Sequence, residues 1–185
     1  PIPRCSLPIA AATLLARSGA KVAINHLPED KRGPEAIAAL HAEGLDVVGA
    51  PGRVGPPEET SQMVESAIAM LGGLDFLVNN AGTPGVKTTV PIARLDLVTD
   101  ELWQQVLSTN LIGMFHCTKA AAQALKVSQG SVVNLASIAA IGGGGSSMAP
   151  TAQNRLLPPA TLAGLANLEL IARKAVEGFL TGMHR

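Results

Sequence analysis

A turn of small polar residues is the most prominent candidate for a binding site. Residues 79–82, Asn-Asn-Ala-Gly, directly follow the short apolar run 74–78. A run this short between turn signals is typical of a strand buried in the middle of a parallel sheet. The turn would then lie at the carboxyl end of the strand, where open α/β sheets bind their ligands. The pattern therefore predicts a ligand site around residues 79–82.

The other groups that could do chemistry stand apart from one another. The histidines are scattered without the spacing of metal ligands, so we expect no metal site. Cys117 follows His116 on a predicted helix, and adjacent helix residues point in different directions, which argues against a Cys–His nucleophile. Cys5 and Cys117 are far apart and form no CxxC motif. Two free thiols favour a reduced, cytoplasmic protein.

Alternating strands and helices must position the turn. Strands are predicted at 21–25, 45–50, 74–78 and 131–136, and helices at 9–18, 34–40, 57–71 and 99–126. Thr99 is the expected N-cap of the long helix, because acidic residues follow it in the first turn. Helices between successive strands imply right-handed βαβ crossovers. We therefore expect an α/β fold with a doubly wound parallel sheet, in a single domain over residues 1–185.

The composition narrows the class of protein. The hydrophobic fraction is 47% but aromatic residues make up only 2%, so Ala, Val, Leu and Ile must build the core. The net charge is zero, and the sequence has neither a basic stripe nor an aromatic platform, which argues against a nucleic-acid partner. No apolar run reaches the ~18 residues that span a membrane, and the first residues do not resemble a signal peptide. We expect no membrane partner.

Four features in this order resemble the short-chain dehydrogenase/reductase family. They are the turn 79–82, Asn110 within STNLIGMFHCTKAA, Ser137 within VVNLASIAA, and the segment 146–149 with the sequence Ser-Ser-Met-Ala. The resemblance runs through residues 1–149, whereas residues 150–185 diverge. It implies a Rossmann-like fold and an NAD(P)(H)-dependent oxidoreductase. Such an enzyme transfers hydride between the nicotinamide and an alcohol or ketone carbon of a small molecule.

The resemblance also implies roles for individual residues. Ser137 would hold the substrate carbonyl by a hydrogen bond, and Asn110 would anchor a water molecule and an active-site lysine. Cofactor contacts are implied for Leu7, Val54, Asn80, Ala81 and Gly82. An ordinary strand-end serine, an exposed helix asparagine and a purely structural turn are the alternatives to these roles.

The catalytic pair of the family is missing. Family members carry Tyr-x-x-x-Lys on a helix, where the lysine lowers the pKa of the tyrosine so that the phenol can act as general acid or base. Counting from Ser137 and the segment 146–149, the tyrosine position is Pro150 and the lysine position is Asn154. The chain contains no tyrosine, so no change of register restores the pair. We expect weak or absent turnover.

The glycine-rich phosphate loop of the family has no counterpart in residues 1–8, where Pro8 removes a backbone amide. The resemblance also implies that the chain lacks the first strand of the family, which would precede residue 1, and the C-terminal strands. Arg53, before Val54, stands where the family has an aspartate that contacts adenine; a solvated loop arginine is the alternative to phosphate binding. Neither His26 nor Leu27 offers a carboxylate for the ribose or an arginine for a 2′-phosphate. NAD and NADP therefore remain alternatives, and the substrate stays open.

Two interpretations account for these departures. The chain is either an impaired oxidoreductase, or a catalytically inactive family member or gene-model fragment that acts through binding or oligomerisation. The abrupt change at Pro150 fits a frame-shifted, mis-spliced or truncated gene product as well as a diverged protein. In the family, the helix that matches 99–126 packs against its twin across a two-fold axis. The resemblance therefore implies a homodimer through this helix.

Overall fold

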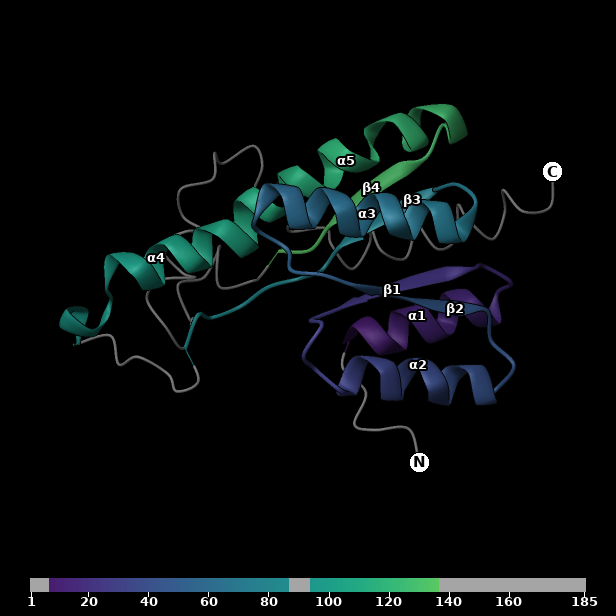
Figure 1. Cartoon of the computed structure of the whole chain (residues 1–185), viewed down its shortest axis with the longest axis horizontal. Helices are drawn as coiled ribbons and strands as arrows, with labels where there is room; N and C mark the ends of the chain where they lie inside the picture. Colours follow the sequence, from purple (N-terminus) through teal and green to yellow (C-terminus); the bar gives the residue numbers. More distant parts are fainter. Residues whose placement is uncertain (1–6, 87–93, 137–185) are drawn as a thin grey trace. The chain divides into compact units, whose positions relative to one another are not determined.

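The computed structural model describes residues 7–86 and 94–136 (Figure 1). Its contacts divide the chain into two compact units. Of the described residues, 7–80 and 113–132 belong to the first unit, and 81–86, 94–112 and 133–136 belong to the second. The prediction of a single domain over residues 1–185 stays a prediction.

Helices and strands alternate in the described residues as the sequence predicts. The helices are α1 (Leu7–Arg17), α2 (Arg32–Ala42), α3 (Pro57–Leu71), α4 (Asp100–Leu107) and α5 (Gly113–Ser128). The strands are β1 (Val22–His26), β2 (Val47–Pro51), β3 (Phe76–Asn79) and β4 (Ser131–Asn134). A short 3-10 helix, η1 (Leu95–Leu97), and a π-helical turn, η2 (Ser108–Ile112), precede and follow α4.

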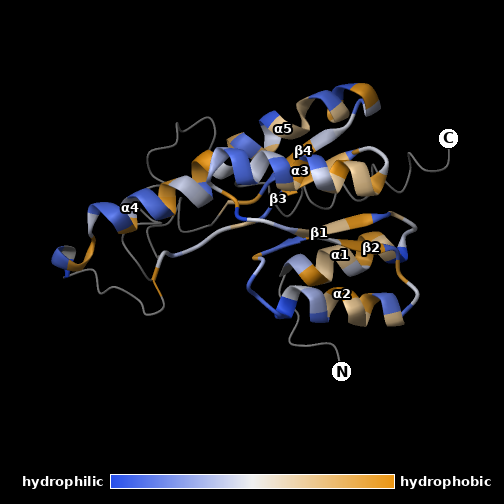
Figure 2. Ribbon diagram, in the orientation of Figure 1, coloured by the Kyte–Doolittle hydropathy of each residue, from blue (hydrophilic) through white to orange (hydrophobic). Residues whose placement is uncertain are grey.

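In the first unit, β1 and β2 form a parallel pair with helices on both faces. Val22 lies opposite Val47 in the register of the pair. Side chains alternate between the faces, so Ile24 packs in a cluster with α1 and α2 whereas the neighbouring Ala23 packs in a cluster with α3 and α5. Figure 1 shows β1 and β2 between these layers, and Figure 2 shows hydrophobic residues along both strands. This is the doubly wound arrangement that the sequence predicts.

Local signals fix the bounds of α3, which match the predicted range 57–71. Pro57 occupies the first turn, where its missing N–H has no partner to lose. Glu58 and Glu59 lie in the same turn, where the helix dipole favours negative charge. Gly72 ends the helix with a left-handed φ of 83°. The helix thus begins and ends on residues whose types alone favour those positions.

The strand β3 is less buried than the sequence predicts. It pairs with β4, beginning at the hydrogen bond from the Ser131 N–H to the Asp75 carbonyl. Phe76 and Val78 are nevertheless 40% and 46% exposed. The expectation of a fully buried strand is therefore wrong for these side chains. The physical reason is that helix α5 and its cluster cover the face of Leu77, while Phe76 and Val78 point to the opposite face.

In the second unit, α4 starts at the predicted cap. The Thr99 hydroxyl accepts a hydrogen bond from the Leu102 N–H at 3.3 Å. Leu102 and Val106 are buried and pack with Val86 and Trp103. The π-helical turn η2 follows directly, so the predicted helix 99–126 consists of three consecutive helical elements rather than one regular helix.

Candidate functional site

The loop Gly52–Gly55 follows the carboxyl end of β2, and hydrogen bonds hold its backbone in place. The N–H of Gly52 donates to the carbonyl of His26 at 3.0 Å, and the carbonyl of Gly52 accepts from the side-chain amide of Asn25 at 2.9 Å. Gly55 has a φ of 137°, in the region that favours glycine. The loop is therefore tied to β1 at its start and depends on glycine at its end.

Side chains from two helices hold the middle of this loop. Glu59 accepts a hydrogen bond from the Arg53 N–H at 2.8 Å. The hydroxyl of Thr60, which is 0% exposed, donates to the Arg53 carbonyl at 3.2 Å and accepts from the Gly55 N–H at 3.1 Å. His116, on α5, bonds the Gly55 carbonyl through Nδ1 at 2.9 Å. A carbonyl can only accept, so the Nδ1 atom of this histidine is the donor.

Val54 differs from the other residues of the loop in its backbone hydrogen bonding. The backbone N–H and C=O groups of Gly52, Arg53 and Gly55 all have partners, whereas no group of the described residues bonds those of Val54. The Val54 side chain packs against the cluster beneath α3 and α5. A fixed loop thus presents one open backbone donor and one open acceptor. Because buried or half-buried backbone groups are nearly always paired, this pair is suited to a ligand.

The Arg53 side chain is already engaged. Its guanidinium donates to Glu29 at 2.6 Å, and both side chains are about half exposed. A backbone hydrogen bond and the Arg53 guanidinium hold the pKa of Glu29 below its ordinary value. Arg53 therefore forms a solvated ion pair, in agreement with the alternative to phosphate binding that the sequence suggests.

Within the first unit, the residue that begins the Asn-Asn-Ala-Gly turn is held by α5. The Asn79 side-chain amide donates to the Thr118 hydroxyl at 3.2 Å, and Thr118 donates in turn to the Met114 carbonyl at 2.7 Å. Asn79 is 6% exposed. The end of β3 is thereby fixed before the chain continues to Asn80.

Within the second unit, the Asn110 side chain forms two hydrogen bonds to the backbone that follows the turn. Its side-chain oxygen accepts from the Thr83 N–H at 2.7 Å, and its side-chain nitrogen donates to the Thr83 carbonyl at 2.9 Å. Asn110 lies in the π-helical turn η2, and such turns occur frequently at functional sites. The side chain of Asn110 is thus committed to the backbone, so the alternative of an exposed, unengaged helix asparagine is wrong.

Gly82 lies beside Asn110, and the space between them can accommodate a Cβ atom. A Cβ atom at Gly82 would meet, among the described residues, only the Asn110 side-chain oxygen, at an ordinary contact distance of 3.6 Å. Gly82 is also absent from the residues with positive φ. Neither packing against Asn110 nor backbone conformation therefore demands a glycine here.

The remaining predicted site residues lie at or beyond the edge of what the structure describes. Ser137, Pro150 and Asn154 lie outside the described residues. Leu7 is the first residue of α1, and only its backbone belongs to the described part. The roles that the sequence assigns to these residues stay predictions.

The residues that hold the loop after β2 carry no distinctive signal in the sequence. By type and position, Thr60 is an ordinary residue in the first turn of a predicted helix, and His116 is one of the scattered histidines. Their partners lie on other elements, so no local pattern could have revealed them. The neighbouring Cys117 is 5% exposed, and burial raises the pKa of its thiol, which agrees with the predicted absence of a Cys–His nucleophile.

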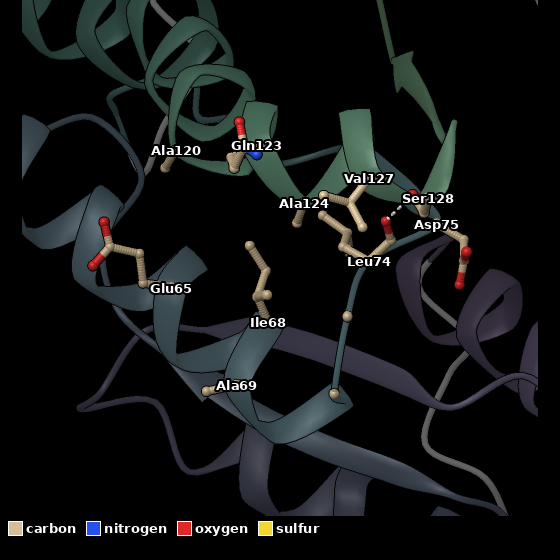
Figure 3. Close-up of a pocket in the computed structure, with 12 residues that line it drawn as sticks. Glu65, Ile68, Ala69, Leu74, Asp75, Ala120, Gln123, Ala124, Val127 and Ser128 are labelled. Atoms are coloured by element: carbon tan, nitrogen blue, oxygen red, sulfur yellow. Dashed lines mark hydrogen bonds between the residues drawn. The ribbon is translucent and has the colours of Figure 1, made fainter.

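A groove between α3 and α5 lies at the other end of the first unit. Ile68, Leu74, Ala124 and Val127 line it, and the Ser128 hydroxyl donates to the Leu74 carbonyl beside it at 2.7 Å (Figure 3). The groove lies where both helices end and β3 begins. Because open α/β sheets bind ligands at the carboxyl ends of their strands, this groove is not part of the candidate site.

Residues 6–150 match the family model for short chain dehydrogenase. The chain belongs to the short-chain dehydrogenase family. The predicted family and its α/β, Rossmann-like fold are thereby confirmed. The family is one of oxidoreductases with an NAD(P)-binding Rossmann fold.

Named relatives show how far the similarity extends. The chain is 31% identical over 131 residues to a 3-oxoacyl-[acyl-carrier-protein] reductase of Staphylococcus aureus, covering 69% of this chain and 50% of the relative. It is 38% identical over 133 residues to dehydrogenase/reductase SDR family member 4 of Oryctolagus cuniculus, covering 71% and 49%. The chain spans about half the length of these relatives.

A solved structure with a bound cofactor resembles this short-chain dehydrogenase. The F189W variant of actinorhodin polyketide ketoreductase with NADPH is 28% identical, with a TM-score of 0.66 over 79% of this chain and 54% of the other. That protein therefore binds NADPH in a fold similar to this one.

Within residues 7–86 and 94–136, no group of His, Cys, Asp and Glu side chains could hold a metal ion. No helix in that part of the chain is both long enough and apolar enough to cross a membrane.

Proposed function

We propose that this short-chain dehydrogenase binds the adenosine end of NAD(H) or NADP(H) at the loop Gly52–Gly55. The observation that carries the proposal concerns the backbone N–H and C=O of Val54. No group in residues 7–86 and 94–136 bonds them, whereas all other backbone groups of the loop are bonded. The Val54 N–H can donate to a ring nitrogen of adenine, and its C=O can accept from an exocyclic amine. The loop also follows the carboxyl end of a parallel strand, which is the expected place.

The other cofactor contacts of the proposal come from the family resemblance. They are Asn80, Ala81, Gly82 and Leu7. The room at Gly82 supports a role in which a ligand, rather than the chain itself, requires the missing side chain. Arg53 is already paired with Glu29, so the proposal assigns it no phosphate.

We further propose that hydride transfer with an alcohol or ketone substrate is weak or absent. The bound nicotinamide would supply the hydride. Ser137 would orient the substrate carbonyl, and Asn110 would serve the site mainly by fixing the backbone at Thr83. Pro150 and Asn154 supply neither a proton donor nor a charge that lowers a pKa. Loss of a positioned general acid costs about 10²–10⁴ in rate.

Titration with NADH and NADPH, followed by energy transfer from Trp103 to the nicotinamide, tests the binding step. Saturable binding that AMP displaces supports an adenosine site, because AMP lacks the nicotinamide. Exchange of Gly82 for Val should weaken the binding without unfolding the protein, since the site has room for a small side chain. Absence of saturable binding of either dinucleotide at millimolar concentration contradicts the proposal.

The double variant Pro150→Tyr, Asn154→Lys tests the catalytic step. If the loss of this pair is what limits turnover, the double variant reduces a ketone with NADPH or NADH faster than the unmodified chain. The control is Pro150→Phe with Asn154→Lys, which lacks only the phenol oxygen. Equal rates for the double variant and this control would show that the phenol is not the missing element.

A second candidate function is association through the helical segment 99–126. Phe115 on α5 is 63% exposed, and Leu111 and Ile112 in η2 are 40% and 43% exposed. Exposed apolar side chains that gather within one turn or two of a helix, as these three do, are typical of an interface, whereas single exposed apolar residues are not. We propose a homodimer in which Phe115 is a contact, independent of whether the protein turns over a substrate.

Sedimentation equilibrium distinguishes the dimer from the monomer. Phe115→Lys should shift the protein toward the monomer, whereas Val127→Lys is a matched control because Val127 is also an exposed apolar residue of α5, at 77%. A monomeric unmodified chain, or equal effects of both variants, would contradict an interface centred on Phe115.

A further inference from the structure

We propose that Thr60 is a positioning residue that orients both peptide planes presenting Val54 to the nucleotide. This inference rests on the proposed function and deepens it. Thr60 itself would contact no ligand. It acts through the loop Gly52–Gly55, where its hydroxyl is bonded on either side of Val54.

The geometry follows from the planarity of the peptide bond. The N–H of Val54 belongs to the same rigid plane as the C=O of Arg53, and the C=O of Val54 belongs to the same plane as the N–H of Gly55. The Thr60 hydroxyl donates to that Arg53 carbonyl at 3.2 Å and accepts from that Gly55 N–H at 3.1 Å. One oxygen atom therefore fixes the direction of both open groups of Val54.

The position of Thr60 makes this oxygen rigid. The residue is 0% exposed and lies in the first turn of α3, so its hydroxyl cannot turn toward water. Its β-branched side chain also has few accessible rotamers in a helix. Glu59 and His116 bond the outer groups of the same loop, at the Arg53 N–H and the Gly55 carbonyl, and leave the two inner groups to Thr60.

Three variants separate positioning from general stability. Thr60→Val keeps the shape and removes both hydrogen bonds, and Thr60→Ser restores the hydroxyl. Thr13→Val is the matched control, because Thr13 is also buried, at 7% exposed, and its hydroxyl bonds the Ile9 carbonyl within α1. Thr60→Cys replaces Thr60→Val if the latter does not fold, since a thiol bonds weakly at nearly the same size.

The first measurement is the dissociation constant of NADH for the full chain. Loss of the two bonds should weaken binding roughly tenfold in Thr60→Val, by the usual worth of a hydrogen bond. Thr60→Ser should lie near the unmodified chain, and Thr13→Val should bind as the unmodified chain does even if it unfolds at lower urea. Equal affinities of Thr60→Val and Thr13→Val would overturn the proposal.

The second measurement needs no ligand, and it tests the positioning role of Thr60 separately from the proposed nucleotide site. Amide hydrogen exchange should accelerate at Gly55 in Thr60→Val and stay unchanged there in Thr13→Val. Unchanged exchange at Gly55 in Thr60→Val would overturn the positioning role. If exchange accelerates but the unmodified chain binds no NADH, the proposed nucleotide site is wrong and the structural role of Thr60 still stands.

Discussion

The loops after β2 and β3 are held in opposite ways. The loop 52–55 is bonded from β1, α3 and α5, and it needs glycine where it meets the core. After β3, the Asn110 side chain is the only group among the described residues that bonds the backbone of Thr83, and a Cβ at Gly82 would make only an ordinary contact with it. The loop 52–55 is thus held by several side chains, whereas the backbone groups of Thr83 are bonded through one amide, that of Asn110.

Gly52→Ala should produce the largest effect, because it forces a side chain into the more crowded loop. The new Cβ atom would stand 2.6 Å from the Met63 Cβ, a distance that requires the backbone to shift. Overpacking of this kind costs about 3 kcal/mol of unfolding free energy. Urea denaturation measures the loss. A change below about 0.5 kcal/mol would show that the loop is not as tightly packed as described.

Asn110→Ala tests the dependence on one amide. Both backbone groups of Thr83 lose their partners, which should lower the unfolding free energy by about 2 kcal/mol. The control is Gln123→Ala, at an exposed position on α5. If the two variants unfold at the same urea concentration, the backbone at Thr83 has another support.

His116→Phe removes one of the several bonds on the loop 52–55. Because Glu59 and Thr60 remain, we expect a loss of only about 1 kcal/mol. His41→Phe is the matched control, since His41 bonds the Val47 carbonyl at the amino end of β2, the strand that this loop follows. Faster amide exchange at Gly55 in His116→Phe but not in His41→Phe would confirm that His116 is one of the supports of this loop; the reverse result would contradict it.

Gly82→Ala should change the stability by less than about 0.5 kcal/mol, because the added methyl group makes only an ordinary contact. The variant differs from Gly52→Ala by position alone. A similar loss of stability in both would contradict the contrast between a crowded loop and an open turn.

The smallest effect concerns the ion pair Asp30–Arg32 after β1. The Arg32 guanidinium, followed by its backbone N–H, lowers the pKa of Asp30 from 3.8 to about 2. Because the folded pKa lies below the unfolded one, the pair favours the folded state above pH 4, and this contribution is lost as the pH falls through about 2. Carboxyl chemical shifts should report the lowered pKa, and Arg32→Gln should return it toward 3.8.

The sequence predicts those parts of the fold that local residue types determine. Helix α3 begins at Pro57 and ends before Gly72 as predicted, because a proline and a left-handed glycine mark its ends. The π-helical turn around Asn110 escaped prediction, since its side chain bonds Thr83, which is remote in sequence. The exposure of Phe76 and Val78 escaped it as well, because an apolar strand pattern does not reveal which elements cover each face.

The candidate site likewise contains residues that the sequence predicts and residues that depend on partners remote in the sequence. Val54 was assigned through the family resemblance, and the structure adds the physical reason that its backbone groups are open. Thr60 and His116 could not be found in the sequence, because their role depends on partners in a loop that the sequence does not place beside them. Ser137 and Pro150 lie outside the described residues, so their part of the prediction awaits the proposed measurements.

The bond between His116 and Gly55 has a consequence for biosynthesis. The two residues are 61 positions apart, and a ribosome that adds about 5–20 residues per second needs about 3–12 s to deliver the second after the first. During this interval the loop after β2 is held by β1 and α3 alone. A nascent chain that carries only these elements should therefore be open to proteases at residues 52–55 until α5 emerges and docks.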